Sequence, residues 1–296
     1  MNLEIYLQER ACLIETTLRE ILPKKDAFPT LIHESMHYSV FAGGKRLRPI
    51  LCLAAVEAIG RDFKPLLPIA CALEMIHTYS LIHDDLPAMD DDDYRRGKLT
   101  NHKVYGEGVA ILAGDALLTY AFEVLAKYGL QFFSPQIVCQ VMQEIALAVG
   151  TKGMIGGQVA DLMAAEQGKK DKNLLIYIHT HKTGALFRAA LRTGALLAGA
   201  TSTELACLTT YAEKFGLAFQ ITDDLLDLTG NSEKLGKTVG SDQAMGKLTF
   251  PALYGIEKSR ELVQEVVDEA LQTLAKLPGE TKPLELLLQY LVVREV

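Results

Sequence analysis

Apolar residues recur at helical spacing along almost the whole chain, and this periodicity limits the possible fold more than any other feature. The strict alternation that marks half-buried strands is nearly absent. The expected helices cover residues 3–22, 30–41, 49–59, 65–85, 109–128, 135–151, 173–200, 203–228, 250–277 and 284–293. Short breaks with Gly, Pro, Asn or Lys separate them. The sequence therefore predicts an all-α protein, a single large helical bundle over residues 1–296.

Composition excludes several classes of function. With 49% hydrophobic residues, the chain can bury a sizeable core. Asp and Glu outnumber Lys and Arg by 37 to 30, so no general attraction to nucleic acid or anionic lipid is expected. No segment reaches the roughly 18 uncharged apolar residues of a membrane span. The absence of a secretory signal and of paired or zinc-spaced cysteines indicates a cytoplasmic protein.

The stretch over residues 184–198 is apolar nearly all round its expected helix. In a water-soluble chain, such a helix is either central in the core or covered by a second subunit. A homo-oligomer, in the form of a homodimer, is expected on this ground.

Six carboxylates lie within ten positions at the end of an apolar helix. Pro87 disfavours helix at the residue before it, so Asp84 and Asp85 are expected at the helix C-terminus and Asp90 in the turn beyond. Carboxylates there oppose the helix dipole, and a bound cation would compensate them. The alternative is a solvated acidic loop, which explains residues 91–93 as well as a functional role does.

A second acidic group falls on one face of a later helix. Four polar residues are spaced i, i+3, i+4 and i+7 among apolar neighbours, namely Gln220, Asp223, Asp224 and Asp227. Three carboxylates on one stripe repel one another unless a cation lies between them. A structural stripe would carry interspersed Lys or Arg, and this turn has none. Two such groups are typical of Mg²⁺ sites, in which water and phosphate complete the coordination.

Basic residues cluster in breaks that contain glycine. The four clusters are at residues 43–48, 95–97, 181–184 and 235–238. Gly lets the backbone approach a ligand closely, and Arg offers a bidentate fork to phosphate oxygens. One such cluster is more often a solvated loop, but four of them with two acidic motifs indicate a phosphorylated substrate. The glycine motifs of nucleotide-binding proteins are absent.

These motifs together resemble the trans-isoprenyl diphosphate synthases, and among them the bacterial farnesyl diphosphate type. The matching segments are GGKRLRP at 43–49, LIHDDLPAMDDDD at 81–93, RRG at 95–97, AILAGD at 110–115, GGQ at 156–158, KTG at 182–184, QITDDLLD at 220–227, GKT at 236–238 and GKLTFP at 246–251. The resemblance implies an isoprenoid synthase bundle with a central active-site cavity. It also implies Mg²⁺-dependent condensation of isopentenyl diphosphate with dimethylallyl or geranyl diphosphate, which gives farnesyl diphosphate.

The resemblance further implies roles for individual residues. About three Mg²⁺ ions per site would connect acidic side chains to the allylic diphosphate. The Mg²⁺-facing carboxylates would be Asp84, Asp85, Asp90, Asp223, Asp224 and Asp227. The allylic substrate would contact Arg95, Lys182, Thr183, Gln220, Lys237 and Lys247. The isopentenyl diphosphate pocket would contain Lys45, Arg48, His77 and Arg96. The residues expected to be catalytic are Asp84, Asp85, Asp90, Arg95, Lys182, Asp223, Asp224 and Lys237.

Product length is expected to depend on residues one turn before the first aspartate. Ser80 lies at i−4 from Asp84, and Tyr79 lies roughly 100° around the helix from Ser80. An aromatic residue at position 79, with the extra Pro87-Ala88 between the aspartates, resembles the farnesyl type. We predict a fifteen-carbon product, a longer one from Tyr79→Ala and a ten-carbon one from Ser80→Phe. The alternative is that Tyr79 is an ordinary core residue.

Other functions stay open at this point. A geranyl or geranylgeranyl diphosphate synthase would carry the same motifs. A terpene cyclase or an Mg²⁺-dependent phosphohydrolase would use similar acids. A non-catalytic synthase subunit would keep the fold and lose the Asp motifs, and both motifs are complete here.

Overall fold

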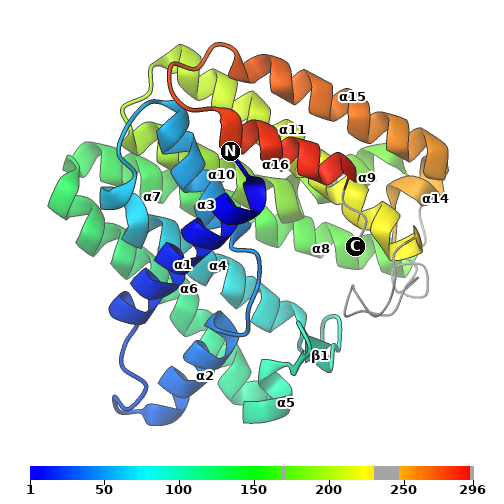
Figure 1. The fold of residues 1–296 in the computed structure, drawn as a ribbon. Coiled ribbons are helices and arrows are strands. Elements are labelled where there is room, and N and C mark those ends of the chain that lie inside the picture. The colour runs from blue at the N-terminus through cyan, green and yellow to red at the C-terminus, as the bar shows by residue number, and fades with distance from the viewer. Residues whose placement is uncertain (168–170, 230–246, 294–296) are drawn as a thin grey trace. The chain divides into compact units, whose positions relative to one another are not determined.

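The computed structural model describes residues 1–167, 171–229 and 247–293, and these are helical almost throughout, as predicted (Figure 1). Up to residue 149 the helices are α1 (Leu3–Ile21), α2 (Thr30–Val40), α3 (Leu47–Ala58), the short 3₁₀ turn η1 (Lys64–Leu66), α4 (Leu67–Asp84), α5 (Asn101–Tyr105), α6 (Glu107–Phe132) and α7 (Pro135–Val149). Then follow α8 (Met154–Gln167), α9 (Lys172–Ile178), the π-helix η2 (His179–Gly184), α10 (Ala185–Leu197), α11 (Ser202–Thr229), α14 (Phe250–Tyr254), α15 (Ile256–Leu274) and α16 (Lys282–Val293).

The contacts divide the chain into two compact units. The N-terminal unit comprises residues 2–53 and 63–142, and the C-terminal unit comprises residue 1 with residues 54–62 and 143–296. Each unit is discontinuous in sequence, because residues 54–62 belong with the later part of the chain. The single domain expected over residues 1–296 stays a prediction.

In the N-terminal unit, α4 is the central helix. It packs against α1, α2 and α6 and is buried over most of its circumference, so its sequence is apolar in nearly every turn. Within this buried part of the helix Glu74 carries a charge, and its side chain is only 1% exposed. The helix ends at Asp84, and Asp85 is its C-cap, as predicted from Pro87.

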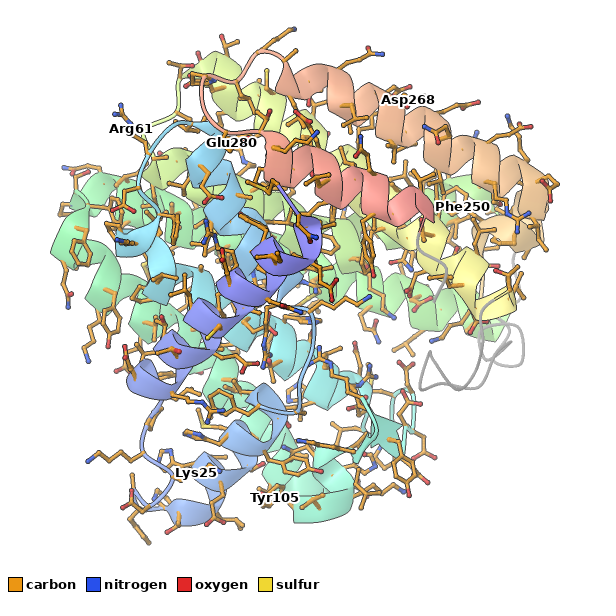
Figure 2. The ribbon with its side chains drawn as sticks, viewed as in Figure 1. Lys25, Arg61, Tyr105, Phe250, Asp268 and Glu280 are labelled. Atoms are coloured by element: carbon orange, nitrogen blue, oxygen red, sulfur yellow. The ribbon has the colours of Figure 1, made fainter. Side chains whose placement is uncertain are left out.

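In the C-terminal unit, α10 and α15 both pack against α11. Every residue of α10 is buried except Arg188 and Arg192, so its apolar circumference is covered within the chain. Covering by a second subunit is not required to explain this helix, and the homodimer stays a prediction. The helix α15 is amphipathic, with Val263 and Val267 buried and Asp268 on the outer side (Figure 2).

The structure contains two helices that were not among the predicted elements, α5 and α8, and it differs from the prediction in three further places. The helix expected over 173–200 is interrupted by the π-helix η2, and the one expected over 250–277 is broken at Gly255, whose φ is +80°. The third difference is a two-stranded antiparallel hairpin, β1 (Tyr94–Arg95) with β2 (Lys98–Leu99), in a stretch too short for a periodic signal.

Two segments are long and apolar enough to cross a membrane by length and composition alone. They are Lys64–Asp84 and Glu107–Phe132, with 67% and 39% of their most apolar windows buried in the structure. Core helices of globular proteins meet the same criterion. The expected lack of a membrane span therefore stays a prediction.

Candidate active site

The first aspartate motif lies where α4 ends. The chain turns back on itself there, because the amide of Asp90 donates a 2.9 Å hydrogen bond to the carbonyl of Asp84. Asp84 and Asp90 are partly exposed, whereas Asp85 is only 3% exposed. The turn therefore brings two accessible acids together at the helix end and directs the third into the protein.

Asp85 is held by a cation from the hairpin. The Nε of Arg95 donates to its Oδ1 at 2.5 Å, and Arg95 Nη2 also donates to Asp92 at 3.1 Å. Burial raises the pKa of Asp85, and the hydrogen bond and charge of Arg95 oppose that shift. For Arg95, burial would lower the pKa, but the bond to Asp85 and the negative charges of Asp85, Asp92 and Asp84 together outweigh it and raise the pKa. The two side chains form a half-buried ion pair at the predicted site.

The hairpin turn also places the next cation. Arg96 and Gly97 both have positive φ, of 54° and 74°, which turns the chain sharply between the two strands. The guanidinium of Arg96 donates to the carbonyl oxygen of Gly43. A Cβ on Gly44 would lie 2.5 Å from the Arg96 Cζ, so the glycine lets this side chain lie directly against the loop.

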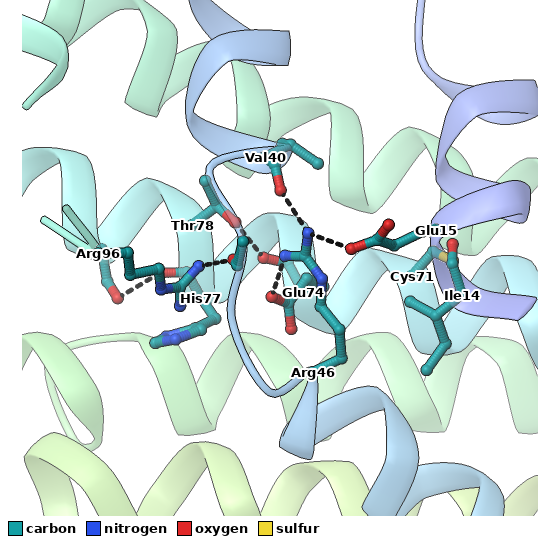
Figure 3. A network of polar contacts seen from close by, with 11 residues as sticks. Ile14, Glu15, Val40, Arg46, Cys71, Glu74, His77, Thr78 and Arg96 are labelled. Carbon is teal, nitrogen blue, oxygen red and sulfur yellow. Dashed lines mark hydrogen bonds and ion pairs between the residues drawn. The ribbon is translucent and has the colours of Figure 1, made fainter. Parts of the chain in front are cut away.

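Three residues of the predicted isopentenyl diphosphate pocket come together in the N-terminal unit. Burial, and then the positive charges of Arg48 and Arg96, lower the pKa of His77 well below its usual value. Burial also lowers the pKa of Arg48 to about 10. Figure 3 shows His77 and Arg96 next to one another. The fourth predicted residue, Lys45, is exposed in the loop before α3, three residues before Arg48. This concentration of positive charge suits a diphosphate.

The second aspartate motif lies near the end of α11, and its members have different surroundings. Asp223 is exposed and Asp227 partly exposed, whereas Asp224 is only 3% exposed. The Asp224 carboxylate accepts a 2.9 Å hydrogen bond from the Phe250 amide. On the same carboxylate, Oδ2 lies 3.4 Å from Nε2 of His179, whose ring stacks on Phe250.

Gln220 is the fourth polar residue of the stripe, and its Nε2 lies 3.5 Å from Oδ1 of Asp224. The periodicity correctly predicted one helix for the four residues, but it did not separate the buried acid from the accessible ones.

Lys182 and Thr183 lie in the π-helix η2, close to α8. The Nζ of Lys182 donates to Asp161 Oδ2 at 2.6 Å. A Cβ on Gly157 would overlap the backbone nitrogen of Lys182, so α8 can approach this segment only with glycine there. On the other side, a Cβ on Gly216 would lie 3.0 Å from Gly184. Close packing on both sides holds the segment that carries the predicted phosphate contacts.

Two predicted residues precede α14. Lys237 lies outside the described residues, and Lys247 is partly exposed. Thr249 begins α14 as its N-cap, where its hydroxyl accepts a hydrogen bond from the Ala252 amide. This short helix also supplies the Phe250 amide that binds Asp224.

The predicted chain-length residues lie on α4. Tyr79 is 6% exposed, and its ring packs edge-on against His83. Burial, and then the charges of Asp84 and Asp115, raise the pKa of Tyr79 to about 12. Ser80 is partly exposed, and its hydroxyl donates to the carbonyl of His77 at 2.8 Å.

No three His, Cys, Asp or Glu side chains in the described ranges are grouped closely enough to hold a metal ion by themselves. Mg²⁺ does not require such a group, because it is commonly bound through one or two carboxylates together with substrate phosphate and water. Asp84 and Asp90, adjacent at the end of α4, are a donor set of this kind. Asp223 and Asp227 supply a second pair one turn apart on α11. The residues therefore fit Mg²⁺ in each unit.

Four polar residues with a part in this arrangement were assigned no role of their own from the sequence. They are Arg46, which was only a member of the basic cluster at 43–48, and Glu74, Asp161 and His179. Glu74 was recognisable, since a single acid in an otherwise apolar helix is the same signal that drew attention to Asp84. Asp161 and His179 contact residues on other helices, so no pattern in the nearby sequence marks them.

Comparisons with known proteins agree with the motifs. A family model described as polyprenyl synthetase matches residues 29–284. A Cyanophora paradoxa protein named geranylgeranyl diphosphate synthase is 48% identical over 295 residues, covering 99% of this chain and 97% of its own. A Fischerella ambigua protein named dimethylallyltranstransferase is 48% identical over 293 residues, covering 99% of this chain and 84% of its own. The crystal structure of an FPP/GFPP synthase from Zymomonas mobilis, 38% identical, has a TM-score of 0.87 and covers 98% of this chain and 99% of that one.

Proposed function

Because the chain belongs to the polyprenyl synthetase family, we propose that it elongates allylic diphosphates with isopentenyl diphosphate and releases geranylgeranyl diphosphate. The observation that carries this product is the 48% identity to the Cyanophora paradoxa geranylgeranyl diphosphate synthase over 99% of the chain. It replaces the farnesyl product that Tyr79 and the spacing of the aspartates suggested as our first choice. The fifteen-carbon diphosphate then becomes an intermediate of elongation.

Mg²⁺ would be held by Asp84 and Asp90 in one unit and by Asp223 and Asp227 in the other. When bound, it would supply positive charge that stabilises the departing diphosphate. The chain's own cations would act in the same direction, with Arg95 bound to Asp85 of the first motif and Lys182 in η2, the segment whose His179 contacts Asp224 of the second.

The proposed reaction balances without a nucleophilic side chain. The allylic carbon–oxygen bond breaks, and diphosphate leaves with the electron pair. The double bond of isopentenyl diphosphate then forms the new carbon–carbon bond, and a proton is lost to the released diphosphate. The residues of the chain bind and orient the two substrates. They also exclude water, which would otherwise quench the allylic cation.

Product analysis tests this proposal. The protein is incubated with Mg²⁺, dimethylallyl diphosphate and isopentenyl diphosphate, and the dephosphorylated products are separated by chromatography. We expect a twenty-carbon alcohol from the wild type and none from the control variant Asp223→Ala. A fifteen-carbon end product would return the assignment to farnesyl diphosphate synthase, whereas inorganic phosphate alone or a cyclic hydrocarbon would exclude chain elongation.

The same assay tests the predicted limit on product length. If the buried ring of Tyr79 limits the growing chain, Tyr79→Ala will give products longer than those of the wild type, and Ser80→Phe will give shorter ones. Unchanged products from Tyr79→Ala would make this residue part of the core only.

A further inference from the structure

The guanidinium of Arg46 is buried beneath residues 43–48, called the loop here, which comprise the turn before α3 and the first two residues of that helix. It binds three other parts of the N-terminal unit (Figure 3). Its Nη1 donates to Glu74 Oε1 on α4 at 2.8 Å. Its Nη2 donates to the carbonyl of Val40 at 2.7 Å and to Glu15 Oε1 on α1 at 3.2 Å. Arg46 is 2% exposed, so this ion pair lies in the protein core.

The loop needs such an anchor because its backbone is unfavourable for ordinary residues. Gly43, Gly44 and Arg46 have φ values of 100°, 121° and 52°. For a residue with a side chain, the left-handed region is sterically unfavourable. Arg46 has this unfavourable backbone conformation, and the hydrogen bonds of its own buried side chain offset it. The guanidinium of Arg96 binds the Gly43 carbonyl from the other side.

The anchored loop carries two predicted contacts to isopentenyl diphosphate, Lys45 and Arg48, on either side of Arg46. Glu74, the other member of the ion pair, lies three residues before His77 on α4 and hence on the same side of that helix. Burial lowers the pKa of Arg48 and of Arg96, and the negative charge of Glu74 opposes both shifts. The same charge helps to raise the pKa of Arg46 against burial.

From these contacts we infer that Arg46 and Glu74 are positioning residues for the isopentenyl diphosphate pocket. They hold the loop over residues 43–48 in its left-handed conformation and thereby aim Lys45 and Arg48 at the diphosphate. This inference rests on the proposed chain elongation. Neither residue touches the substrate in this role, so their removal affects binding through the loop.

The experiment separates positioning from a purely structural role by using two ways to remove the ion pair. Arg46→Met leaves Glu74 buried without its cation, which destabilises the protein. The double variant Arg46→Met/Glu74→Leu replaces both charges with apolar groups, and such replacements commonly restore stability. KM for isopentenyl diphosphate, KM for the allylic substrate, kcat and Tm are measured for each, with kinetics well below the lowest Tm.

We expect both variants to raise KM for isopentenyl diphosphate about 10-fold, because a small misplacement of binding groups has large effects. KM for the allylic substrate stays within about 3-fold of the wild type. The double variant recovers Tm but not KM. Recovery of both together would overturn the inference and make the pair structural only, as would unchanged KM in both variants.

Two further variants complete the test. Glu74→Gln keeps an oxygen acceptor for Arg46 but removes the charge, and we expect a KM rise of about 3-fold. A KM below that of the wild type would show that Glu74 only offsets the positive charge of the pocket, which contradicts positioning. The matched control is Arg192→Met, which removes a bidentate ion pair with Glu144 in the C-terminal unit. It lowers Tm and leaves KM unchanged.

A wild-type protein that forms no carbon–carbon bond would contradict the proposed function itself. An active wild type whose KM does not respond to Arg46→Met would contradict the positioning role alone.

Discussion

In the N-terminal unit the second of two adjacent aspartates, Asp85, is buried against the guanidinium of Arg95. Its counterpart in the C-terminal unit, Asp224, is buried against the amide of Phe250 and the ring of His179. Both are 3% exposed, and in both motifs the preceding aspartate is more accessible. One acid of each pair therefore fixes the local structure, while its neighbours remain accessible to solvent.

The difference lies in the partner. A side-chain cation such as Arg95 can exchange its carboxylate for a phosphate, because both present oxygens to the same fork. A backbone amide cannot move in this way without displacing α14. The comparison predicts that the contact of Asp85 with Arg95 can rearrange when a phosphate binds, and that the contact of Asp224 with the Phe250 amide stays fixed.

The largest effects are expected at the accessible acids. Asp84→Ala and Asp223→Ala will each lower kcat by more than about 100-fold, because each removes charge that holds the cation opposite the leaving group. Tm will stay within about 2 °C, as for other accessible residues. Steady-state kinetics and thermal unfolding measure both, with Asp268→Ala on the outer side of α15 as the control. Wild-type kcat in either variant would remove that aspartate from the metal site.

Substitution of the buried acids by Asn distinguishes their partners. Asp85→Asn leaves Arg95 without its main carboxylate and will lower the free energy of unfolding by about 2 kcal/mol. Asp224→Asn keeps an oxygen for the Phe250 amide and will cost only about 1 kcal/mol. Urea denaturation measures both values. Equal losses would mean that the two buried acids have equivalent roles and would break the comparison.

The glycines of the two units give a smaller difference. A Cβ on Gly157 would meet the backbone of Lys182, whereas a Cβ on Gly114 would meet the side chain of His83, which can rotate away. Gly157→Ala will therefore destabilise the protein by about 1–2 kcal/mol, and Gly114→Ala by less than that. Gly157→Ala will also raise KM for the allylic substrate, since it displaces Lys182. The reverse order of stabilities would contradict the rigid packing of η2.

The smallest effect concerns pH. His77 has a pKa well below 6.5 in the folded protein, so the unfolded chain binds its proton more readily. Its contribution to stability is complete above pH 6.5 and is lost as the pH falls below that value. Wild type will therefore lose up to about 1 kcal/mol more per pH unit than His77→Gln between pH 6.5 and 5. Urea denaturation at several pH values measures this, and parallel curves for the two proteins would contradict it.

The sequence predicted the helical fold and the place of both aspartate motifs, because helical periodicity and Pro87 act locally. It could not predict that Asp224 is buried and Asp223 exposed, since the helix stripe is the same for both. That difference comes from Phe250, 26 residues further along the chain. The sequence also gave no sign that helix 173–200 changes its hydrogen bonding at His179, where packing against two other helices decides the geometry.

The π-helix η2 has a consequence for how the chain tolerates changes in length. A π-turn completes one rotation with one residue more than an α-turn. Deleting one residue between His179 and Gly184 would therefore join α9 and α10 into one regular helix without rotating α10. Within a regular α-helix each residue corresponds to a rotation of about 100°, so the same deletion between Ala185 and Arg188 would turn Arg188 and Arg192, the two residues of α10 outside the core, toward it. A chain shortened in α10 would fail by burying charge, whereas one shortened in η2 would keep the register of that helix.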